Sequence, residues 1–333
     1  MGKSKQFILY YRAAKAFLFF VRRAFIGRYS SIVKKNVPVD NINVDNINVD
    51  EIKAKMFDFW RKELHFSEST CEYRANNIFN YSHYLSIMKE IKQRFGDLRG
   101  LRVLDAGCGW GTLSVLLQKE GVQLTSIDYV PAHLEVTRQR LEGQGDGFCA
   151  DLRNLQNIIK DNSYDIVVSH AVIEHIGNFR DDRRSGDAKE TLNDKLTFVK
   201  ELYRVLKPGG RAFISTGNYD YFVDGEVRIC CFQWLPDKYQ KEILKDIGLD
   251  ASDYGLLKWT EFEKLFLDAG FQISDIVKLD VDVVKNLLHL LAPVISVFIP
   301  NFTPKLVDVL LHMLEYEPIA MPAWNVFLTK PNI

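Results

Sequence analysis

A glycine-rich turn between an apolar strand and an apolar helix is the strongest chemical signal in the sequence. Residues 103–112 read VLDAGCGWGT, so Asp105 precedes glycines at positions 107, 109 and 111. Glycine lets a backbone pass close to a ligand, and the helix that begins there offers free N–H groups. A dinucleotide-binding turn has the spacing G-x-G-x-x-G, but Thr112 stands at its third glycine position. A carboxylate just before the glycines repels pyrophosphate, so the pattern favours a cationic ligand over NAD.

Two further acids follow the next two predicted strands. Asp128 ends the second strand, where a carboxylate can accept both hydroxyls of a ribose. Asp151 follows a short third strand and can hold an adenine amino group while Leu152 packs on the ring. The alternatives are a helix-capping acid at Asp128 and a solvated loop acid at Asp151.

Proton transfer, where an acceptor requires it, has three candidates after the fourth predicted strand. That strand ends at Ser169 and His170 in the segment YDIVVSHAVIEHI, and the candidates are His170, Glu174 and His175. Imidazole titrates near working pH, which suits it to this chemistry. The Glu-His-Ile segment alternatively only shapes the loop. No metal ligand is assigned and metal dependence stays open, because the acids and histidines near Glu174 could bind magnesium but lack strict ligand spacing.

The elements that position these residues alternate between strands and helices, which predicts an α/β fold with a parallel sheet covered on both faces. Strands are predicted at 102–105, 123–128, 147–149, 165–169, 211–216, 271–279 and 323–329. Helices are predicted at 112–120, 131–142, 193–206 and 260–269.

Four features of the sequence occur in an order that resembles class I S-adenosylmethionine-dependent methyltransferases. They are the glycine turn, the acids after the second and third strands, the 164–176 segment and LKPGG at 206–210. The resemblance spans about residues 98–216, and segments 258–279 and 324–330 resemble the last helix and antiparallel strand pair of that family. It implies a doubly wound, Rossmann-like sheet of seven mostly parallel strands whose last strand is antiparallel.

The resemblance also implies the cofactor S-adenosylmethionine and a role for each matching residue. Asp105 would face the methionine part of the cofactor, Gly107 and Gly109 would line it, Asp128 would bind the ribose, and Asp151 with Leu152 the adenine. The full set of predicted cofactor-binding residues is Asp105, Gly107, Cys108, Gly109, Gly111, Asp128, Tyr129, Asp151, Leu152 and Ser169.

The expected function is methyl transfer, at oxygen, to a small-molecule, lipid-linked or glycan acceptor. The loop after the fourth strand resembles quinone-precursor O-methyltransferases, and the segment 218–236 resembles methyltransferases found with bacterial surface-glycan enzymes. Two alternatives remain open: a non-catalytic binding module of the same fold, and a nicotinamide-dependent oxidoreductase. Nucleic acid is disfavoured as a partner, because the Asn-Pro-Pro-Tyr type of base-binding motif is absent where Ser169–Val172 stands.

Charge is unevenly distributed in a chain that is formally neutral, with 43 basic and 43 acidic residues. Residues 1–35 hold nine basic residues and no acidic one, and an apolar stripe at 7–25 predicts a basic amphipathic helix. The longest uncharged run there, 16–21, is far below the roughly 20 residues of a membrane span. Three interpretations stay open: a helix on an anionic membrane surface, an organelle presequence, and a helix packed on the body. The predicted location is the cytoplasm, with peripheral membrane attachment under the first interpretation.

The remaining segments complete the predicted domain organisation. A tandem VDNIN repeat marks residues 36–50 as a linker, residues 51–97 form N-terminal helices, and residues 98–333 form the methyltransferase domain. Two insertions, 218–258 and 282–318, should determine acceptor choice. The second has no charged residue from 286 to 304, which favours either a buried cap or a lipid-contacting surface. Five cysteines without C-x-x-C spacing argue against a disulfide framework and a zinc cluster.

Overall fold

The computed structural model describes residues 49–62, 68, 71–72, 75, 81–177, 188–217, 256–277 and 323–332. The chain divides into two compact units, 1–46 and 47–333, and all described residues belong to the second. The predicted helix at 1–35, most of the predicted linker and nearly all of both insertions lie outside the described residues. Among the described residues, no helix is long and apolar enough to span a membrane.

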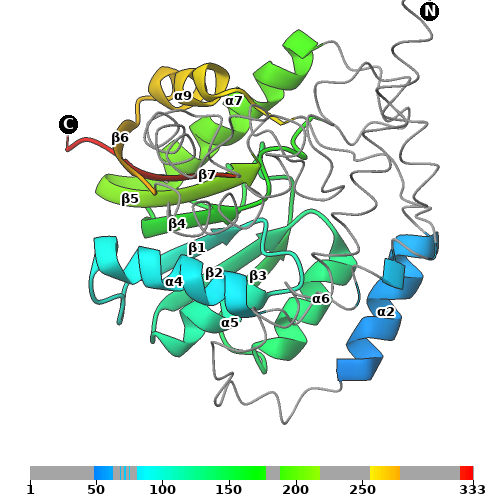
Figure 1. Cartoon of the computed structure of the whole chain (residues 1–333). Coiled ribbons are helices and arrows are strands. Elements are labelled where there is room, and N and C mark those ends of the chain that lie inside the picture. Colours follow the sequence, from blue (N-terminus) through cyan, green and yellow to red (C-terminus); the bar gives the residue numbers. More distant parts are fainter. Residues whose placement is uncertain are drawn as a thin grey trace, which may run out of the picture. The chain divides into compact units, whose positions relative to one another are not determined.

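A seven-stranded sheet forms the centre of the second unit (Figure 1). Its strands are β1 Arg102–Ala106, β2 Gln123–Asp128, β3 Asp146–Cys149, β4 Tyr164–His170, β5 Leu206–Gly217, β6 Gln272–Ile276 and β7 Ala323–Thr329. They lie in the order β3-β2-β1-β4-β5-β7-β6, and β7 runs antiparallel to both of its neighbours while the other pairs are parallel. This confirms the predicted fold class. The direction of winding reverses between β1 and β4, which is where open α/β sheets bind ligands, outside the carboxyl ends of the strands.

Helices cover both faces of the sheet, as a parallel sheet requires. They are α2 Val49–Lys62, α4 Tyr81–Phe95, α5 Thr112–Lys119, α6 Pro131–Arg140, α7 Ala188–Val205 and α9 Trp259–Asp268. Successive strand residues point to opposite faces. Leu104 and Ala106 accordingly join the core that contains Phe198 of α7 and Phe262 of α9. Phe327 of β7, on the other face, contacts Phe95 of α4 with ring centroids 5.2 Å apart.

The strand β5 differs from its prediction at its start. The sequence predicted a helix up to residue 206 and a strand from residue 211, but Leu206 already pairs with Tyr164. The ladder then shifts register, and Ile166 pairs with Arg211. Backbone bonds from Gly209 N–H to the carbonyl of Lys330, and from Lys330 N–H to the carbonyl of Gly210, hold the intervening residues in the sheet. The segment is therefore a bulge within the strand.

The helix α2 begins at Val49, two residues before the predicted start of the N-terminal helices at residue 51. Asp50 and Glu51 occupy its first turn and Arg61 and Lys62 its last, which complements the helix dipole. Its fully buried Met56 and Trp60 pack in one cluster with Val136 of α6. The packing of α2 on α6 brings the N-terminal helices to the ligand-binding edge of the sheet.

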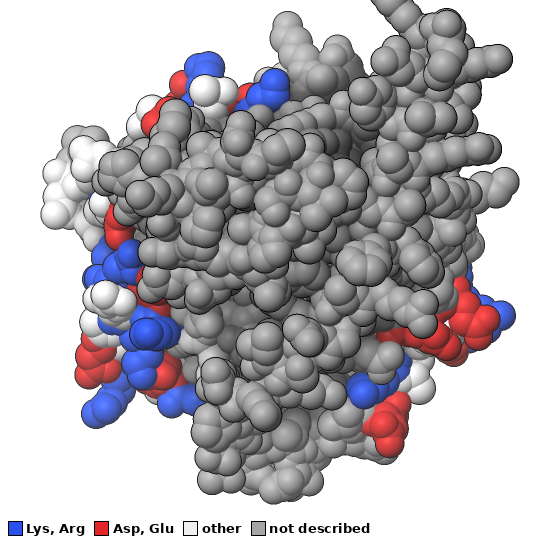
Figure 2. Space-filling view, viewed as in Figure 1, with Lys and Arg blue, Asp and Glu red and all other residues white. Residues whose placement is uncertain are grey.

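Charges on the described surface are mixed in sign, as Figure 2 shows for one face. Lys92 pairs with Glu120 at 2.8 Å, Arg94 with Asp275 at 2.6 Å, and Lys207 with Asp165 at 2.6 Å. These exposed or half-exposed pairs are worth little to stability individually. The described surface in that view therefore presents no continuous field of one sign.

Candidate active site

The glycine turn follows the carboxyl end of β1, and its backbone has a conformation that residues with side chains rarely adopt. Gly107, Gly109 and Gly111 have φ of +87°, +52° and +80°. The N–H groups of Gly107 and Cys108 donate to the carbonyl of Ile127 at 2.8 and 2.9 Å, which ties the turn to β2. A β-carbon on Gly107 would lie 2.3 Å from Cγ2 of Val172, in the loop after β4. Both the backbone conformation and the packing therefore require glycine at position 107. The turn contacts both β2 and the loop after β4.

Asp105 lies buried beneath this turn and is 1% exposed. Its carboxylate accepts a hydrogen bond from Ser114 Oγ of α5 at 2.5 Å, and that hydroxyl lies 3.1 Å from Ser126 Oγ of β2. Burial raises the pKa of Asp105 to about 7; the bond from Ser114 opposes this rise and the charge of Asp128 adds to it. The structure thus holds a carboxyl group that is easily protonated near neutral pH. Its predicted position opposite the methionine part of a cofactor stays a prediction.

Asp128, at the end of β2, accepts three hydrogen bonds at the candidate site. Its Oδ2 accepts the N–H of Gly109 at 2.8 Å, and its Oδ1 accepts the N–H of Val130 at 2.9 Å and Nδ1 of His133 at 3.2 Å. Burial alone would raise the pKa of Asp128, but the hydrogen bond and charge of His133 and the two backbone bonds outweigh it, and the pKa is lowered. Asp128 is therefore an ionised carboxylate held against the glycine turn. Of about four acceptor positions on a carboxylate, three are occupied.

His133 is a site residue that the sequence analysis missed. Its ring contacts Trp110 of the glycine turn at a centroid distance of 5.9 Å and Phe59 of α2 at 5.6 Å, both edge to face. Its Nε2 is buried without a hydrogen-bond partner among the described residues. One signal in the sequence pointed to it: His133 stands in the first turn of the helix that follows Asp128.

The predicted adenine-binding residues lie at the ends of β2 and β3, but Asp151 is already engaged. Arg153 Nε lies 3.0 Å from both of its oxygens, and Arg153 Nη1 donates to Asp194 of α7 at 2.7 Å. The hydrogen bond from Arg153 lowers the pKa of Asp151. Leu152 is buried in the main core, whereas Tyr129 is 63% exposed. The exposed ring after β2 is thus more accessible than the paired carboxylate.

The carboxyl end of β4 lies beside the glycine turn. Ser169 Oγ donates to the carbonyl of Ala106 at 2.9 Å, which fixes the end of β4 to the end of β1. The next residue, His170, has a buried Nδ1 without a hydrogen-bond partner among the described residues. Burial, reinforced by the neighbouring His83, lowers the pKa of His170 to about 3. His170 is therefore an uncharged imidazole at working pH.

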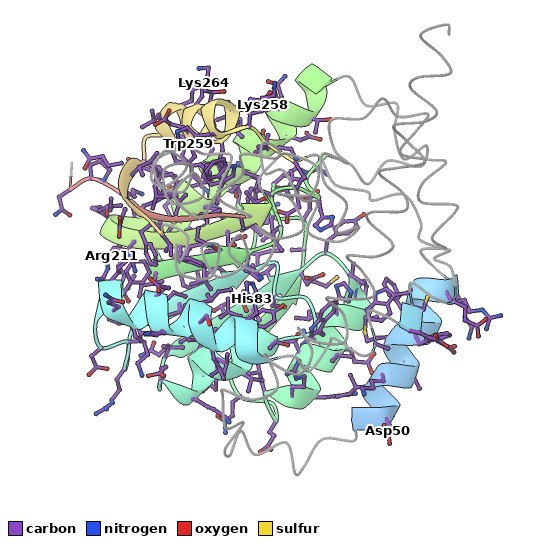
Figure 3. All side chains as sticks on the ribbon, viewed as in Figure 1. Asp50, His83, Arg211, Lys258, Trp259 and Lys264 are labelled. Atoms are coloured by element: carbon purple, nitrogen blue, oxygen red, sulfur yellow. The ribbon has the colours of Figure 1, made fainter. Side chains whose placement is uncertain are left out.

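Two residues of α4 that the sequence analysis missed complete this side of the site. Measured between centroids, the ring of His170 lies 5.0 Å from the ring of His83 and 5.3 Å from the ring of Tyr84. Figure 3 shows His83 at the end of α4 that lies near the carboxyl ends of the strands. No local pattern indicated them, because α4 precedes every motif that resembles a methyltransferase.

The remaining predicted residues bind the loop after β4 to its neighbours. Glu174 is buried and accepts a hydrogen bond from Thr216 Oγ1 of β5 at 2.7 Å. Burial raises the pKa of Glu174. Lys195 Nζ of α7 donates to the carbonyls of Ile173 and Ile176 at 2.5 and 2.9 Å. The structure thus directs Glu174 to the end of β5, while His175 is partly buried in the same loop.

Comparison with known proteins identifies the domain. A family model described as a methyltransferase domain matches residues 104–214. The chain is 25% identical over 236 residues to the "Ubiquinone biosynthesis O-methyltransferase" of Rickettsia conorii, covering 68% of this chain and 72% of that protein. It is 33% identical over 126 residues to the protein of the same name from Xylella fastidiosa, covering 37% of this chain and 44% of that protein.

Among solved structures, a putative sarcosine dimethylglycine methyltransferase from Galdieria sulphuraria aligns with a TM-score of 0.45 at 20% identity, covering 75% of this chain and 85% of that chain. The family match contains the glycine turn, Asp128 and the end of β4. Together with the order of the seven strands, it shows that residues 104–214 form a methyltransferase domain of the class I, S-adenosylmethionine-dependent type.

Proposed function

We propose that this enzyme transfers the methyl group of S-adenosylmethionine to a hydroxyl oxygen of a small-molecule acceptor. The observation that carries the proposal is that an ionised Asp128, bound to the glycine turn at the end of β2, and an uncharged His170, at the end of β4, flank the end of β1 where the sheet changes direction. The first can hold a cofactor, and the second borders the space where an acceptor must lie. The relatives named as O-methyltransferases support oxygen as the methylated atom.

The residues at the glycine turn fit the cofactor. A β-carbon on Gly109 would meet no atom within 4 Å, so there is open space beside the turn at that position. Asp128 retains one acceptor position, and the 3.2 Å bond from His133 is the longest of its three contacts. A ribose diol would take the free position and displace His133. In this proposal the backbone at Gly107 and Gly109 lines the methionine part, and Tyr129, Asp151 and Leu152 surround the adenine.

When bound, the cofactor supplies a methyl group on a positively charged sulfur. The protein's contribution to an in-line transfer is alignment, which can be worth roughly 7 to 11 kcal/mol of the barrier. Ser169 holds the ends of β1 and β4 together, and Val172 packs against Gly107. Cofactor and acceptor are thus positioned by strand ends that are bonded to each other. The buried Asp105 adds a negative potential under the turn when it is ionised.

Binding of the cationic cofactor is expected to release a proton from Asp105. Its pKa of about 7 in the free protein means that it is about half protonated at pH 7, and a nearby cation favours the ionised form. The raised pKa of Asp105 also makes the stability of the folded protein depend on pH. A carboxyl group whose pKa is raised on folding makes its full contribution to stability at pH values below its pKa in the unfolded chain. That contribution is lost as pH rises through the folded-state pKa of about 7. Calorimetry with S-adenosylmethionine in two buffers of different ionisation enthalpy measures the release. An unchanged release in Asp105→Asn would assign the proton to another group.

The reaction class is tested by titrating the protein with S-adenosylhomocysteine and, in parallel, with NADH. Binding of S-adenosylhomocysteine alone, followed by transfer of labelled methyl from S-adenosylmethionine to a hydroxyl acceptor, supports the proposal. Binding of NADH would favour the oxidoreductase alternative. Binding of neither would leave a non-catalytic module of the same fold.

We also propose that the acceptor is lipid-linked and that residues 1–35 hold the enzyme at an anionic membrane surface. The support is the nine basic residues of that segment and the uncharged run at 286–304. Each basic residue near anionic lipid is worth about 1 kcal/mol. Deleting residues 1–35 is expected to release the protein from anionic liposomes in a sedimentation assay while leaving its affinity for S-adenosylhomocysteine unchanged. Persistent binding after the deletion would instead point to the segment around Pro293.

A further inference from the structure

Three rings from two elements form a cluster at the acceptor side of the site: His83 and Tyr84 from α4 and His170 from β4. The two imidazole rings are tilted by 47° at 5.0 Å, and Tyr84 stands edge to face on both, at 5.3 Å from His170 and 5.7 Å from His83. Because these rings come from a helix and a strand far apart in the sequence, only the packing of α4 on the body holds them together.

The helix α4 is anchored firmly enough to position this cluster. Ile87, Met88, Ile91 and Phe95 are buried along its length. At its far end Arg94 pairs with Asp275 of β6, and Arg211 of β5 donates to the carbonyl of Phe95 at 3.0 Å. The His83 end is therefore placed by a helix that is fixed to the sheet.

The three groups have different protonation behaviour. Burial lowers the pKa of His83, and burial together with His83 lowers the pKa of His170 to about 3. Burial and the charge of Asp105 raise the pKa of Tyr84 to about 12, against an opposing effect of Arg140. Near neutral pH the cluster therefore holds two uncharged imidazoles and one protonated phenol. His83 is the most exposed of the three residues, although the packing of its ring against His170 and Tyr84 partly desolvates it, so it is the imidazole that an acceptor can reach.

We propose that His83 is the general base that removes the proton from the acceptor hydroxyl, with His170 and Tyr84 as positioning residues. This role rests on the proposed function. The O–H bond breaks as its proton moves to the unprotonated ring nitrogen of His83, and the oxygen forms its new bond to the methyl carbon. The bond between that carbon and sulfur breaks, and its electron pair stays on sulfur, which loses its positive charge. The proton leaves His83 to solvent through its exposed side.

The basicity of His83 determines which kind of acceptor hydroxyl it can deprotonate. A phenol has a pKa of about 10, whereas an aliphatic hydroxyl resembles water, at about 15.7. An imidazole whose pKa lies below its usual 6.5 can assist the ionisation of the first far better than that of the second. A phenolic hydroxyl therefore suits this site better than a sugar alcohol, and catechol is the appropriate first acceptor probe.

The test compares the full chain with His83→Gln and with Lys89→Gln, an exposed residue of the same helix that serves as the matched control. All three proteins are expected to bind S-adenosylhomocysteine with the same affinity, which establishes that they are folded. With catechol, the wild type and Lys89→Gln should show a rate that falls on acidification, with a midpoint below the usual imidazole value of 6.5. His83→Gln should be slower by about 10²- to 10⁴-fold. Its rate should also rise with pH up to the pKa of the acceptor itself.

Histidine NMR provides a readout that does not depend on turnover. The chain has seven histidines, and the resonance lost in His83→Gln identifies His83. It is expected to titrate below pH 6.5 and to shift when catechol is added to the S-adenosylhomocysteine complex. A wild-type rate and pH profile in His83→Gln, or an unperturbed resonance on addition of catechol, would overturn the role of His83. A wild type that binds S-adenosylhomocysteine but methylates no hydroxyl would overturn the proposed function itself.

Discussion

Replacing Asp128 with alanine is expected to weaken the binding of S-adenosylhomocysteine by about 10- to 150-fold, the equivalent of about 1.5 to 3 kcal/mol for lost charge-assisted hydrogen bonds. Two effects act in the same direction. The variant lacks the proposed acceptor for the ribose hydroxyls, and it leaves the N–H of Gly109 without its partner at 2.8 Å. Calorimetric titration measures the change directly.

The design separates these two effects with a second substitution and a control. Asp128→Asn keeps one carbonyl oxygen, so it should retain part of the affinity. Asp268→Ala removes an exposed acid at the end of α9 that pairs with Lys264, and it should bind S-adenosylhomocysteine like the wild type. Unchanged affinity in Asp128→Ala would remove this residue from the cofactor site and would leave it only its bonds to Gly109, Val130 and His133.

Replacing Gly107 with alanine is expected to destabilise the folded protein by about 2 to 5 kcal/mol. A side chain at φ +87° costs about 1 to 2 kcal/mol, and forcing a methyl group into a filled space adds about 1 to 3 kcal/mol. The new β-carbon would lie 2.3 Å from Cγ2 and 3.2 Å from Cβ of Val172. Those atoms lie close to their own backbone, so the loop after β4 must move. Denaturant unfolding measures the loss.

Gly109→Ala is the matched comparison, because its β-carbon would meet no atom within 4 Å and only the backbone cost of about 1 to 2 kcal/mol remains. The double variant Gly107→Ala/Val172→Ala should recover part of the lost stability, with a coupling of at least about 0.5 kcal/mol between the two sites. Equal losses in Gly107→Ala and Gly109→Ala, or strict additivity with Val172→Ala, would show that the packing between the turn and this loop contributes nothing.

Local sequence patterns were sufficient wherever the structure depends on short-range rules. Apolar runs and turn residues predicted β2 and β7 to the residue, and the glycine pattern located the turn after β1, because backbone conformation and strand periodicity are local properties. The order of motifs also placed Asp128 and His170 at strand ends on the same edge of the sheet. In a parallel sheet the carboxyl ends of neighbouring strands must meet there.

Tertiary packing decided the environment of those residues. The direction of Glu174 toward Thr216 joins elements that are distant in the chain. The burial of Asp105 against Ser114 and the bond between Asp128 and His133 depend on how a helix packs against the strand that precedes it. These contacts depend on which face of a helix meets which strand, and hydrophobic periodicity marks only that a face is apolar.

The amino-acid sequence by itself thus determined the fold class, the glycine turn and the acids that follow the first three strands. Only the tertiary structure brought His83 and Tyr84 to His170. The physical reason is that a protonation state depends on burial and on neighbouring charges. Both are properties of the packed molecule and leave no mark in the local sequence.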